Sequence, residues 1–469
     1  MKDYKTISRI YFIGIGGIGM SALARYFLSK NVIVSGYDKT STTLTQQMEA
    51  EGMPIHYEDN LNLIDKNADL VVYTPAIPKS QKELNYYKDH NYQLAKRSDV
   101  LLEITKDSFN ICVAGTHGKT TISTMIAHIL RNSGFGCNAL LGGISINYNT
   151  NFWSSENNVY VVEADEYDRS FLKLFPDIAV ITAMDADHLD IYGTKENMEE
   201  AFVEFANHIK PSGLLFTKYG LPEKHFTAST HLRYSLQNPA ADVYASNNRM
   251  KNGGYEFNVI TTKRIIENVK LNMGGMHNVE NAVAAIVIAD YLEIDPEKIS
   301  EAVETFKGVK RRFEYIINVK EAEKSVNNVV FIDDYAHHPQ ELSALIRGAK
   351  SLFSNRECTL IFQPHLFSRT KDFAKEFAES LDMADRILLL PIYPARELPV
   401  DGVTSELILK EMKNKNATVI SKEELIKYIK GDYIKLVHES SYGEVLITAG
   451  AGDIDKLVQP MKEILLNNF

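Results

Sequence analysis

A glycine-containing loop at residues 115–121 has the residue types that bind a nucleoside triphosphate. It consists of Gly115, Thr116, His117, Gly118, Lys119, Thr120 and Thr121. Glycines let successive backbone N–H groups converge on phosphate oxygens, Lys119 can neutralise phosphate charge and Thr120 can ligate Mg²⁺. The loop departs from the G-x-x-x-x-G-K-[ST] pattern because Val113 stands at the first glycine position. We predict an ATP-type phosphate site, with a helix-entry turn and an exposed lysine as the alternative.

Acidic residues follow the apolar run at 159–162. They are Glu163, Asp165, Glu166 and Asp168. Carboxylate oxygens bind the hard cation that accompanies ATP phosphates, although such a cluster can also be a solvated loop. Next to a phosphate loop we favour a metal site, with Glu163 as its first ligand. His188, flanked by two aspartates, is a candidate imidazole ligand for a second divalent ion, with a structural histidine as the alternative.

A second glycine pattern, G-x-G-x-x-G, lies near the start of the chain. Its glycines are Gly14, Gly16 and Gly19, and Gly17 lies between them. An apolar run precedes the pattern, a helix-like stretch follows it, and Asp38 stands about 20 residues later, where a ribose-binding acid is expected. Taken alone, these residues favour an NAD site. The physical inference is a pyrophosphate at a helix N-terminus.

Polar residues in the second half of the chain offer further candidates. Asn278 and Asn281 share one face of a predicted helix, where they could contact nucleotide or cap the helix. Arg311 and Arg312 could reach phosphates, with a solvated basic pair as the alternative. The adjacent histidines at 337–338 lack the i, i+4 spacing of a helical zinc site, so zinc is not expected.

Composition narrows the class of protein. Hydrophobic residues make up 45% of the 469 residues and charged residues 24%, which is typical of a globular protein. The net charge of −10, with no Lys/Arg block, argues against a nucleic-acid partner. Three scattered cysteines give neither a disulfide framework nor a thiolate metal site. No apolar run is long enough to span a membrane. We expect a cytoplasmic protein without membrane insertion.

The elements that must position these residues alternate between apolar runs and helical periodicity. This alternation predicts an α/β fold with mainly parallel sheets. We predict three domains: a Rossmann-like N-terminal domain (1–106), a central P-loop-type ATPase domain with a mainly parallel sheet (107–313) and a C-terminal Rossmann-like α/β domain (314–469). Nearly every polar cluster follows the carboxyl end of an apolar run, which is the edge where parallel sheets bind ligands. Residues 251–254, "KNGG", predict a hairpin.

With these motifs assembled, the chain resembles the Mur ligase family over essentially its whole length. The resemblance rests on the order and spacing of "GIGGIGMS" (14–21), "GTHGKTT" (115–121), "EADEYDRSF" (163–171), "DADHLDIYG" (185–193), "HNVENA" (277–282), "GVKRRFE" (308–314), "DDYAHHP" (333–339), "QPHLFSRT" (363–370) and "GAGDI" (450–454).

The resemblance implies an ATP-dependent ligase. The implied reaction joins L-alanine to the lactyl carboxylate of UDP-N-acetylmuramate through an acyl phosphate, in peptidoglycan precursor synthesis. The cofactors would be ATP and Mg²⁺, with Mn²⁺ as an alternative ion, and the enzyme would be a monomer or a homodimer. The first domain would hold the UDP-sugar, the second ATP and the metal, and the third would close over both and admit the amino acid.

The resemblance also implies roles for particular residues. Catalytic roles fall on Lys119, Glu163, His188, Asn281, Arg312 and Asp334. ATP would be bound by the loop at 115–121 with Asn278, Asn281 and Arg312, and the metal by Thr120, Glu163 and His188. The UDP-sugar would be bound by Gly14, Gly16, Gly17, Gly19 and Asp38, and the amino acid by Tyr335, His337 and Arg369.

Departures and rival interpretations remain open at this point. Some relatives carry Arg where this chain has Leu366, so part of the charge of the amino-acid pocket must come from elsewhere or is dispensable. The carbamoylated lysine of several sister ligases has no assigned position here. The rivals are a sister ligase that attaches a recycled peptide to the same sugar, an NAD-dependent oxidoreductase supported only by residues 14–38, and a non-catalytic binding module.

Overall fold

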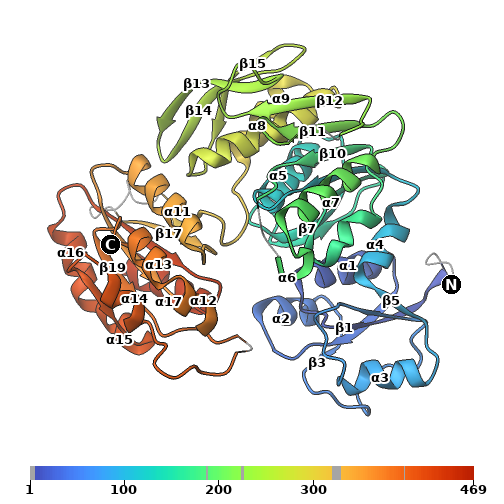
Figure 1. Cartoon of the computed structure of the whole chain (residues 1–469), viewed down its shortest axis with the longest axis horizontal. Coiled ribbons are helices and arrows are strands. Elements are labelled where there is room, and N and C mark those ends of the chain that lie inside the picture. The colour runs from blue at the N-terminus through green and yellow to red at the C-terminus, as the bar shows by residue number, and fades with distance from the viewer. Residues whose placement is uncertain (1–5, 186–188, 223–225, 319–328, 396, 469) are drawn as a thin grey trace. The chain divides into compact units, whose positions relative to one another are not determined.

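The computed structural model describes residues 6–185, 189–222, 226–318, 329–395 and 397–468. Its strands form three sheets and helices alternate with them along the chain (Figure 1). The α/β class and the mainly parallel sheets are therefore confirmed. Contacts between Cα atoms divide the chain into two compact units: a first unit of residues 1–246, 259–266 and 280–303, and a second of residues 247–258, 267–279 and 304–469. Each unit is described by itself.

The N-terminal sheet is parallel and has the strand order β3-β2-β1-β4-β5. Its strands are β1 (Arg9–Ile13), β2 (Ile33–Tyr37), β3 (Ile55–His56), β4 (Leu70–Tyr73) and β5 (Leu94–Lys96). Its helices are α1 (Ile18–Ser29), α2 (Thr43–Ala50), α3 (Lys82–Asp89) and α4 (Arg97–Thr105). From β1, the chain first adds β2 and β3 on one side and then β4 and β5 on the other. Such doubly wound sheets bind ligands at the point where the strand order changes direction, which here is beside β1. The predicted Rossmann-like character is confirmed.

The central sheet has ten strands in the order β15-β14-β13-β12-β11-β10-β6-β9-β7-β8. They are β6 (Phe109–Ala114), β7 (Asn138–Ser145), β8 (Thr150–Trp153), β9 (Val159–Glu163), β10 (Ile178–Ile181), β11 (Leu214–Lys218), β12 (Thr230–Ser235), β13 (Val243–Lys251), β14 (Gly254–Ile260) and β15 (Ile265–Leu271). The pairs around β6 and β10 are parallel, and β7 and β8 pair antiparallel. Two residues with positive φ, Asn252 at 52° and Gly253 at 75°, join β13 to β14. This geometry suits a tight hairpin turn, as predicted.

Helices of the central region include α5 (Lys119–Asn132), α6 (Leu189–Tyr192), α7 (Lys195–Asn207), α8 (Met276–Tyr291), α9 (Pro296–Thr305) and the 3₁₀ segment η2 (Tyr167–Lys173). The apolar residues of α5 at 122, 125, 126, 129 and 130 are buried, as their helical spacing predicts. Gly134, with φ of 83°, lies just past the end of α5, where a left-handed residue commonly stops a helix.

The C-terminal sheet lies in the second unit and has the order β16-β17-β21-β18-β19-β20. Its strands are β16 (Glu314–Ile317), β17 (Val329–Asp334), β18 (Glu357–Phe362), β19 (Arg386–Leu389), β20 (Ala417–Val419) and β21 (Glu444–Ala449). Only β16 runs antiparallel to its neighbour. Its helices include α11 (Pro339–Leu352), α12 (Phe367–Asp372), α13 (Ala374–Leu381), α14 (Glu406–Glu411), α15 (Lys422–Tyr428), α16 (Ile434–Glu439) and α17 (Asp455–Leu466).

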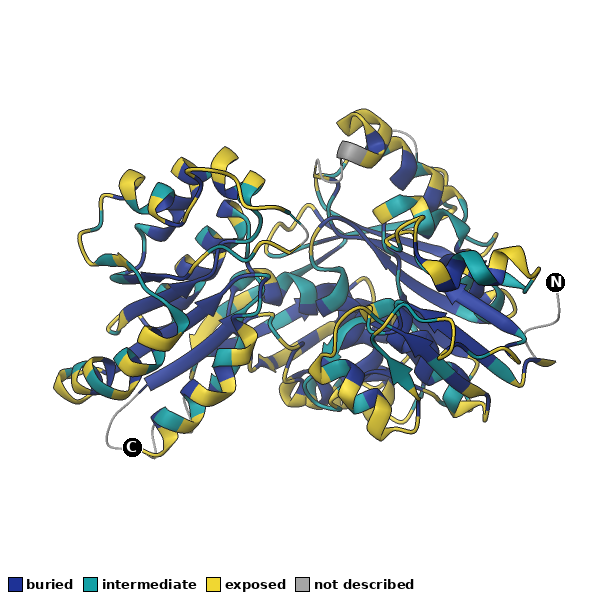
Figure 2. Ribbon diagram, turned by 90° about the horizontal axis from the view of Figure 1, so that it is seen from below, coloured by how far each residue is buried: buried dark blue, intermediate teal, exposed yellow. Residues whose placement is uncertain are grey.

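The buried residues lie mainly in the strands and on the helix faces that cover the sheets. The strands are mostly dark blue in Figure 2, while the helices show yellow outward faces and dark inner ones. One hydrophobic core in the first unit contains residues from both the N-terminal and the central sheet, among them Phe12, Phe27, Val162 and Phe205. Within the described residues, no helix combines the length and the apolar character that crossing a membrane requires. The domain boundaries predicted at 106 and 313 stay predictions.

Candidate active site

The loop at 115–121 connects β6 to α5 and takes a backbone conformation that requires glycine. Gly115 and Gly118 have φ of 127° and 80°. A Cβ atom on Gly115 would lie 2.1 Å from Thr182 Oγ1, so no side chain fits there. The Thr182 hydroxyl donates to the carbonyl oxygens of Ala114 and His117, which ties the loop to the end of β10. The strand, loop and helix therefore have the arrangement that binds phosphate at a helix N-terminus.

Lys119 is held in a buried ion pair. Its Nζ donates to the carbonyl oxygen of Gly115 at 2.7 Å and to Glu166 Oε1 at 2.8 Å. Its side chain is 14% exposed and that of Glu166 only 1%. Burial alone would lower the pKa of Lys119, but the charges of Glu166 and then Glu163 outweigh it and raise that pKa above its ordinary value. Lys119 is therefore positively charged at neutral pH.

Glu163 ends β9 beside the first turn of α5. Its Oε1 accepts from the Thr120 hydroxyl at 3.0 Å, and its Oε2 accepts from the backbone N–H of Gly142 at 3.1 Å. A Cβ atom on Gly142 would lie 2.3 Å from Glu163 Oε2, so glycine is needed for the carboxylate to occupy this position. A threonine hydroxyl beside a carboxylate is a donor set that suits Mg²⁺. His188, the predicted partner ligand, lies outside the described residues.

A cavity of about 410 Å³ brings the two predicted phosphate sites together within the first unit. Gly17 and Gly19, from the first turn of α1, line one part of it. Lys119, Glu163 and Glu166 line another. The remaining walls include residues 74–76 after β4 and residues 140–142 of β7.

The rest of the N-terminal glycine loop is occupied by its own hydrogen bonds. The backbone N–H groups of Gly14 and Ile15 both donate to the carbonyl oxygen of Tyr37. The N–H of Gly16 donates to Asp38 Oδ2 at 2.8 Å. Asp38 is the acid expected to bind ribose or uridine, and here its carboxylate caps the loop. Its predicted role toward a ligand stays a prediction.

Arg97 was missed by the sequence analysis. It begins α4, lines the cavity and forms an ion pair with Asp165, with 3.3 Å between Nη2 and Oδ2. Its Nη1 lies 2.4 Å from where a Cβ atom on Gly19 would stand, so the third glycine of the pattern makes room for this guanidinium. Arg97 belongs to no motif, and only the fold brings it to the glycines.

Two predicted nucleotide-contacting asparagines differ in their surroundings. Asn281 Oδ1 lies 2.9 Å from where a Cβ atom on Gly118 would stand, which places this side chain against the phosphate loop. The Asn278 amide donates to the carbonyl oxygen of Gly274 at 2.7 Å, at the start of α8. The structure therefore supports a helix-entry role for Asn278 and places Asn281 beside the glycine loop at 115–121, while contact with a nucleotide stays a prediction.

In the second unit, the adjacent arginines at 311 and 312 have different roles. Arg311 is part-buried; its Nε lies 3.3 Å from Asp333 Oδ2, and its guanidinium donates to the carbonyl oxygens of Gly450 and Gly452. Arg312 is exposed, with its guanidinium 5.6 Å from the centre of the Tyr335 ring. The first arginine stabilises the loop after β21, and the second is available to a ligand.

The Asp334 carboxylate accepts hydrogen bonds from two backbone segments, one that follows the two arginines and one that follows β17. Its Oδ2 accepts from the N–H of Phe313 and its Oδ1 from the N–H of Ala336, each at 2.7 Å. Burial raises the pKa of Asp334, opposed by Arg312. The acid predicted to be catalytic is therefore bonded to backbone in this structure, and its role toward substrate stays a prediction.

The predicted amino-acid pocket combines a histidine and an arginine. Burial chiefly lowers the pKa of His337, and the nearby charges of Arg369 and Arg312 lower it further. Arg369 Nη1 is buried and has no hydrogen-bond partner among the residues that the structure describes. Tyr335 and His337 stack edge to face at 5.1 Å. Leu366, the departure noted in the sequence, adopts φ of 71° and precedes α12.

Comparison with protein families and known proteins agrees with this arrangement. Three family models match successive parts of the chain: "Mur ligase family, catalytic domain" over residues 9–109, "Mur ligase middle domain" over 113–289 and "Mur ligase, glutamate ligase domain" over 311–452. The UDP-N-acetylmuramate–L-alanine ligases of Flavobacterium johnsoniae and Porphyromonas gingivalis (strain W83) are 45% and 46% identical over 467 residues. These alignments cover 99% and 98% of this chain and 99% of each relative.

Solved structures give the same result. The UDP-N-acetylmuramate–alanine ligase of Thermotoga maritima superposes with a TM-score of 0.82 at 27% identity, covering 98% of this chain and 100% of that one. A murein peptide ligase of Psychrobacter arcticus shares the fold, with a TM-score of 0.67 at 24% identity over 98% and 99% of the two chains. Matches of this extent identify the chain as a member of the Mur ligase family.

Proposed function

We propose that the chain is an ATP-dependent ligase that joins L-alanine to the lactyl carboxylate of UDP-N-acetylmuramate. The observation that carries this proposal is the single cavity shared by the α1 glycines, Lys119 and Glu163. A carboxylate can react with the γ-phosphate of ATP only if both are held in one water-restricted space. A relative that is 45% identical to this chain over nearly its whole length is named for this activity.

The first step of the proposed reaction activates the carboxylate. A lactyl carboxylate oxygen attacks the γ-phosphorus of ATP, the bond from that phosphorus to the β–γ bridging oxygen breaks, and ADP leaves. Because two anions must approach each other, electrostatic stabilisation and positioning supply most of the rate. We assign this stabilisation to Lys119, whose ammonium is held by the Gly115 carbonyl and Glu166, and we assign phosphate binding to the backbone N–H groups of the loop at 115–121.

Thr120 and Glu163 are the residues that would hold Mg²⁺. Bound there, Mg²⁺ supplies a positive charge that offsets the charge developing on the phosphoryl oxygens. Their hydroxyl and carboxylate donor set is consistent with this ion. His188 is proposed as a further ligand on the family resemblance alone.

The second step forms the amide bond. The neutral amine of L-alanine attacks the acyl carbon, the bond from that carbon to the phosphate oxygen breaks, and the proton lost by the nitrogen leaves with inorganic phosphate as hydrogen phosphate. Arg369, with its buried unpartnered nitrogen, is proposed to bind the carboxylate of alanine, with Tyr335 and His337 shaping the pocket. Alanine differs from glycine by one methyl group, worth about 1–3 kcal/mol, so turnover of glycine at reduced efficiency is expected.

The decisive experiment incubates the protein with ATP, Mg²⁺, UDP-N-acetylmuramate and each amino acid in turn, and follows ADP and product mass. L-alanine as the preferred acceptor amine supports the proposal. Preference for a peptide over alanine would make the chain a peptide-attaching sister ligase, and nicotinamide reduction without ADP would make it an oxidoreductase. The proposed substrates imply a cytoplasmic location, and light scattering would test the predicted monomer or homodimer.

A further inference from the structure

Glu166 is one of four clustered acids in the sequence, but its structural position differs from the others. Its side chain is 1% exposed, whereas that of Asp165 is 40% exposed. Its backbone carbonyl accepts from the Tyr192 hydroxyl at 2.7 Å and from the N–H of Arg169 at 3.0 Å. The segment after β9 thus fixes this carboxylate in the cavity wall, whereas the sequence singled it out only as one of four clustered candidate metal ligands.

The hydrogen bonds of Lys119 explain what this position achieves. A lysine ammonium has three N–H donors in a tetrahedral arrangement. Among the described residues, one donor goes to the carbonyl oxygen of Gly115 and one to Glu166 Oε1. With two of its three bonds fixed, the ammonium can no longer rotate freely, and the direction of the third N–H is set.

We propose that Glu166 is a positioning residue that, together with the Gly115 carbonyl, orients the Lys119 ammonium so that its third N–H serves the transferring phosphoryl group. This inference rests on the proposed function, because it assigns Glu166 to the phosphoryl-transfer step. The gain is in rate: a lysine on a flexible four-carbon chain would otherwise lose conformational freedom during the reaction.

The second oxygen of Glu166 indicates that the pair is not kept for stability. Oε2 is buried without a hydrogen-bond partner in the described part of the chain, and Glu166 lines the cavity. An unpaired buried carboxylate oxygen costs free energy, and a buried ion pair seldom adds net stability over an apolar pair. A hydrogen-bond donor carried by a bound ligand would complete this carboxylate. Such an incomplete buried polar group is characteristic of a functional site.

Two substitutions separate the charge of Glu166 from its geometry. Glu166→Gln keeps the size and one oxygen acceptor but removes the charge, whereas Glu166→Ala removes both. We expect kcat to fall about 10–100-fold for Glu166→Ala and by less for Glu166→Gln, the range expected for a misplaced catalytic group. KM for ATP should stay within a few-fold, because the loop N–H groups still bind the phosphates.

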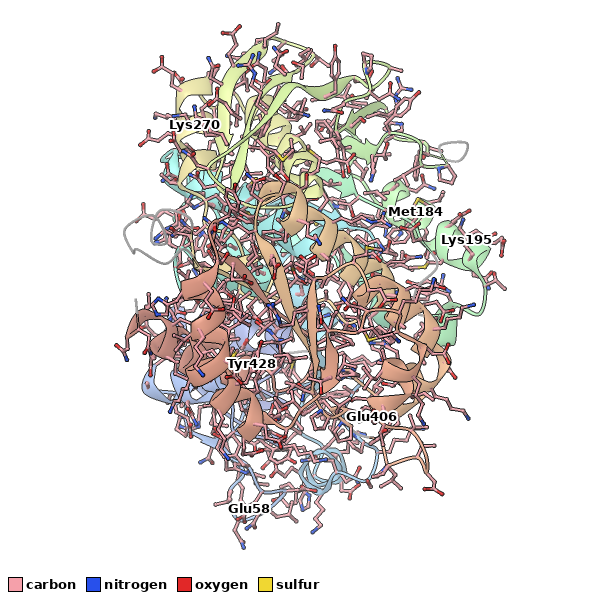
Figure 3. The ribbon with its side chains drawn as sticks, turned by 90° about the vertical axis from the view of Figure 1, so that its left-hand side faces the viewer. Glu58, Met184, Lys195, Lys270, Glu406 and Tyr428 are labelled. Carbon is pink, nitrogen blue, oxygen red and sulfur yellow. The ribbon has the colours of Figure 1, made fainter. Side chains whose placement is uncertain are left out.

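The matched control is Glu199→Gln. Glu199 pairs with Lys195 on the outer face of α7, with 3.4 Å between Oε1 and Nζ, and Lys195 is labelled at the right-hand edge of Figure 3. This variant loses a lysine–glutamate ion pair that is partly exposed and lies outside the cavity, so wild-type kinetics are expected. Thermal denaturation of all three variants checks that they fold. If Glu166→Ala does not fold, the test uses Glu166→Gln alone, and the expected result is a lower kcat with KM for ATP retained.

Each outcome decides the inference. A lower kcat with KM for ATP retained, graded from Gln to Ala, supports positioning. A kcat within about threefold of wild type in Glu166→Ala would overturn it, since misplacement of Lys119 should cost more. A rise in KM that accounts for the whole loss would also overturn it, because Glu166 would then act in ATP binding. Absence of ADP release by the wild-type chain would overturn the proposed function and this inference together.

Discussion

Lys119 places a positive charge between the Gly115 carbonyl of the phosphate loop and Glu166, one of the acids after β9. We predict that Lys119→Ala abolishes ADP release, because the variant loses the ammonium held against the phosphate loop, which would offset the charge of the γ-phosphate. Affinity for UDP-N-acetylmuramate, measured by titration calorimetry, should change by only about two- to threefold, because the proposed binding residues for that substrate are the glycines at the start of α1 rather than Lys119. Equal loss of both functions would contradict the division into two phosphate sites.

Glu163 gives a second prediction at the residue scale. Glu163→Gln should raise the Mg²⁺ concentration needed for half-maximal ADP release by about tenfold or more, since an amide oxygen is a much weaker ligand for a hard cation. The glutamine oxygen can still accept from the Gly142 N–H, and its amide can donate to the Thr120 hydroxyl, so the local fold should survive. The measurement is a Mg²⁺ titration of initial rate, with Glu199→Gln as the control. An unchanged titration curve would refute the metal assignment.

At the scale of elements, the register of β7 against β9 decides where Glu163 points. Gly142 in β7 leaves room for the Glu163 carboxylate, and a Cβ atom there would lie 2.3 Å from Oε2. Gly142→Ala should therefore displace the Glu163 carboxylate. Its backbone φ is not in the left-handed region, so alanine fits the strand itself. We expect a raised Mg²⁺ requirement similar in direction to that of Glu163→Gln, with a melting temperature within a few degrees of wild type.

The stability of Gly142→Ala is best compared with that of a second glycine variant, Gly115→Ala. There φ is 127° and the added Cβ would lie 2.1 Å from Thr182 Oγ1, so both the backbone and the packing oppose alanine. Gly115→Ala should lower stability markedly, measured by thermal denaturation. If Gly142→Ala were the more destabilising of the two, the view that it acts through Glu163 would be wrong.

Local sequence signals predicted the elements that are long and periodic. The strand, loop and helix of residues 109–132 followed from an apolar run and i, i+3, i+4 spacing, and the structure confirms them. The strands β3, β5 and β20 were missed because each has only two or three residues, too few for periodicity.

The residues of the candidate site could also be predicted only in part from the sequence, but for a different reason. Motif residues such as Lys119 and Glu163 could be selected because their types and positions after strands are informative. The contributions of Gly142 and Arg97 depend on which strands and helices become neighbours in space, and neither residue lies in a motif. The acid Glu166 was visible, but its separate role follows only from its burial and its bond to Lys119.

For the whole molecule, buried carboxyl groups outside the cavity set how stability depends on pH. Burial raises the pKa of Glu83, Asp333 and Glu444 to about 7 each. Glu83 lies in α3 beside the N-terminal sheet, whereas Asp333 and Glu444 lie in β17 and β21 of the C-terminal sheet. Each of the three is nearly inaccessible to solvent. A carboxyl group whose pKa is higher in the folded than in the unfolded state binds more protons when folded. The free energy of unfolding should therefore decrease as pH rises from about 4.5 to 7.

Glu83 provides the test of this pH dependence. Its Oε2 accepts from the Tyr11 hydroxyl at 2.7 Å and its Oε1 accepts from the N–H of Asn60 at 3.1 Å, while His56 and Asp59 lie close by. Glu83→Gln mimics the protonated carboxyl at every pH. The Tyr11 hydroxyl can then accept from the amide and donate to His56 Nε2, 2.7 Å away.

We expect this variant to show a shallower loss of unfolding free energy between pH 5 and pH 8 than the wild type. One such group contributes up to about 1.4 kcal/mol per pH unit between its two pKa values. Urea denaturation at a series of pH values measures the slope, and Glu199→Gln, which replaces a partly exposed acid, should leave it unchanged. If Glu83→Gln kept the full wild-type slope, Glu83 would be ionised in the folded protein throughout this range, and the loss of stability toward neutral pH would have to come from Asp333 and Glu444.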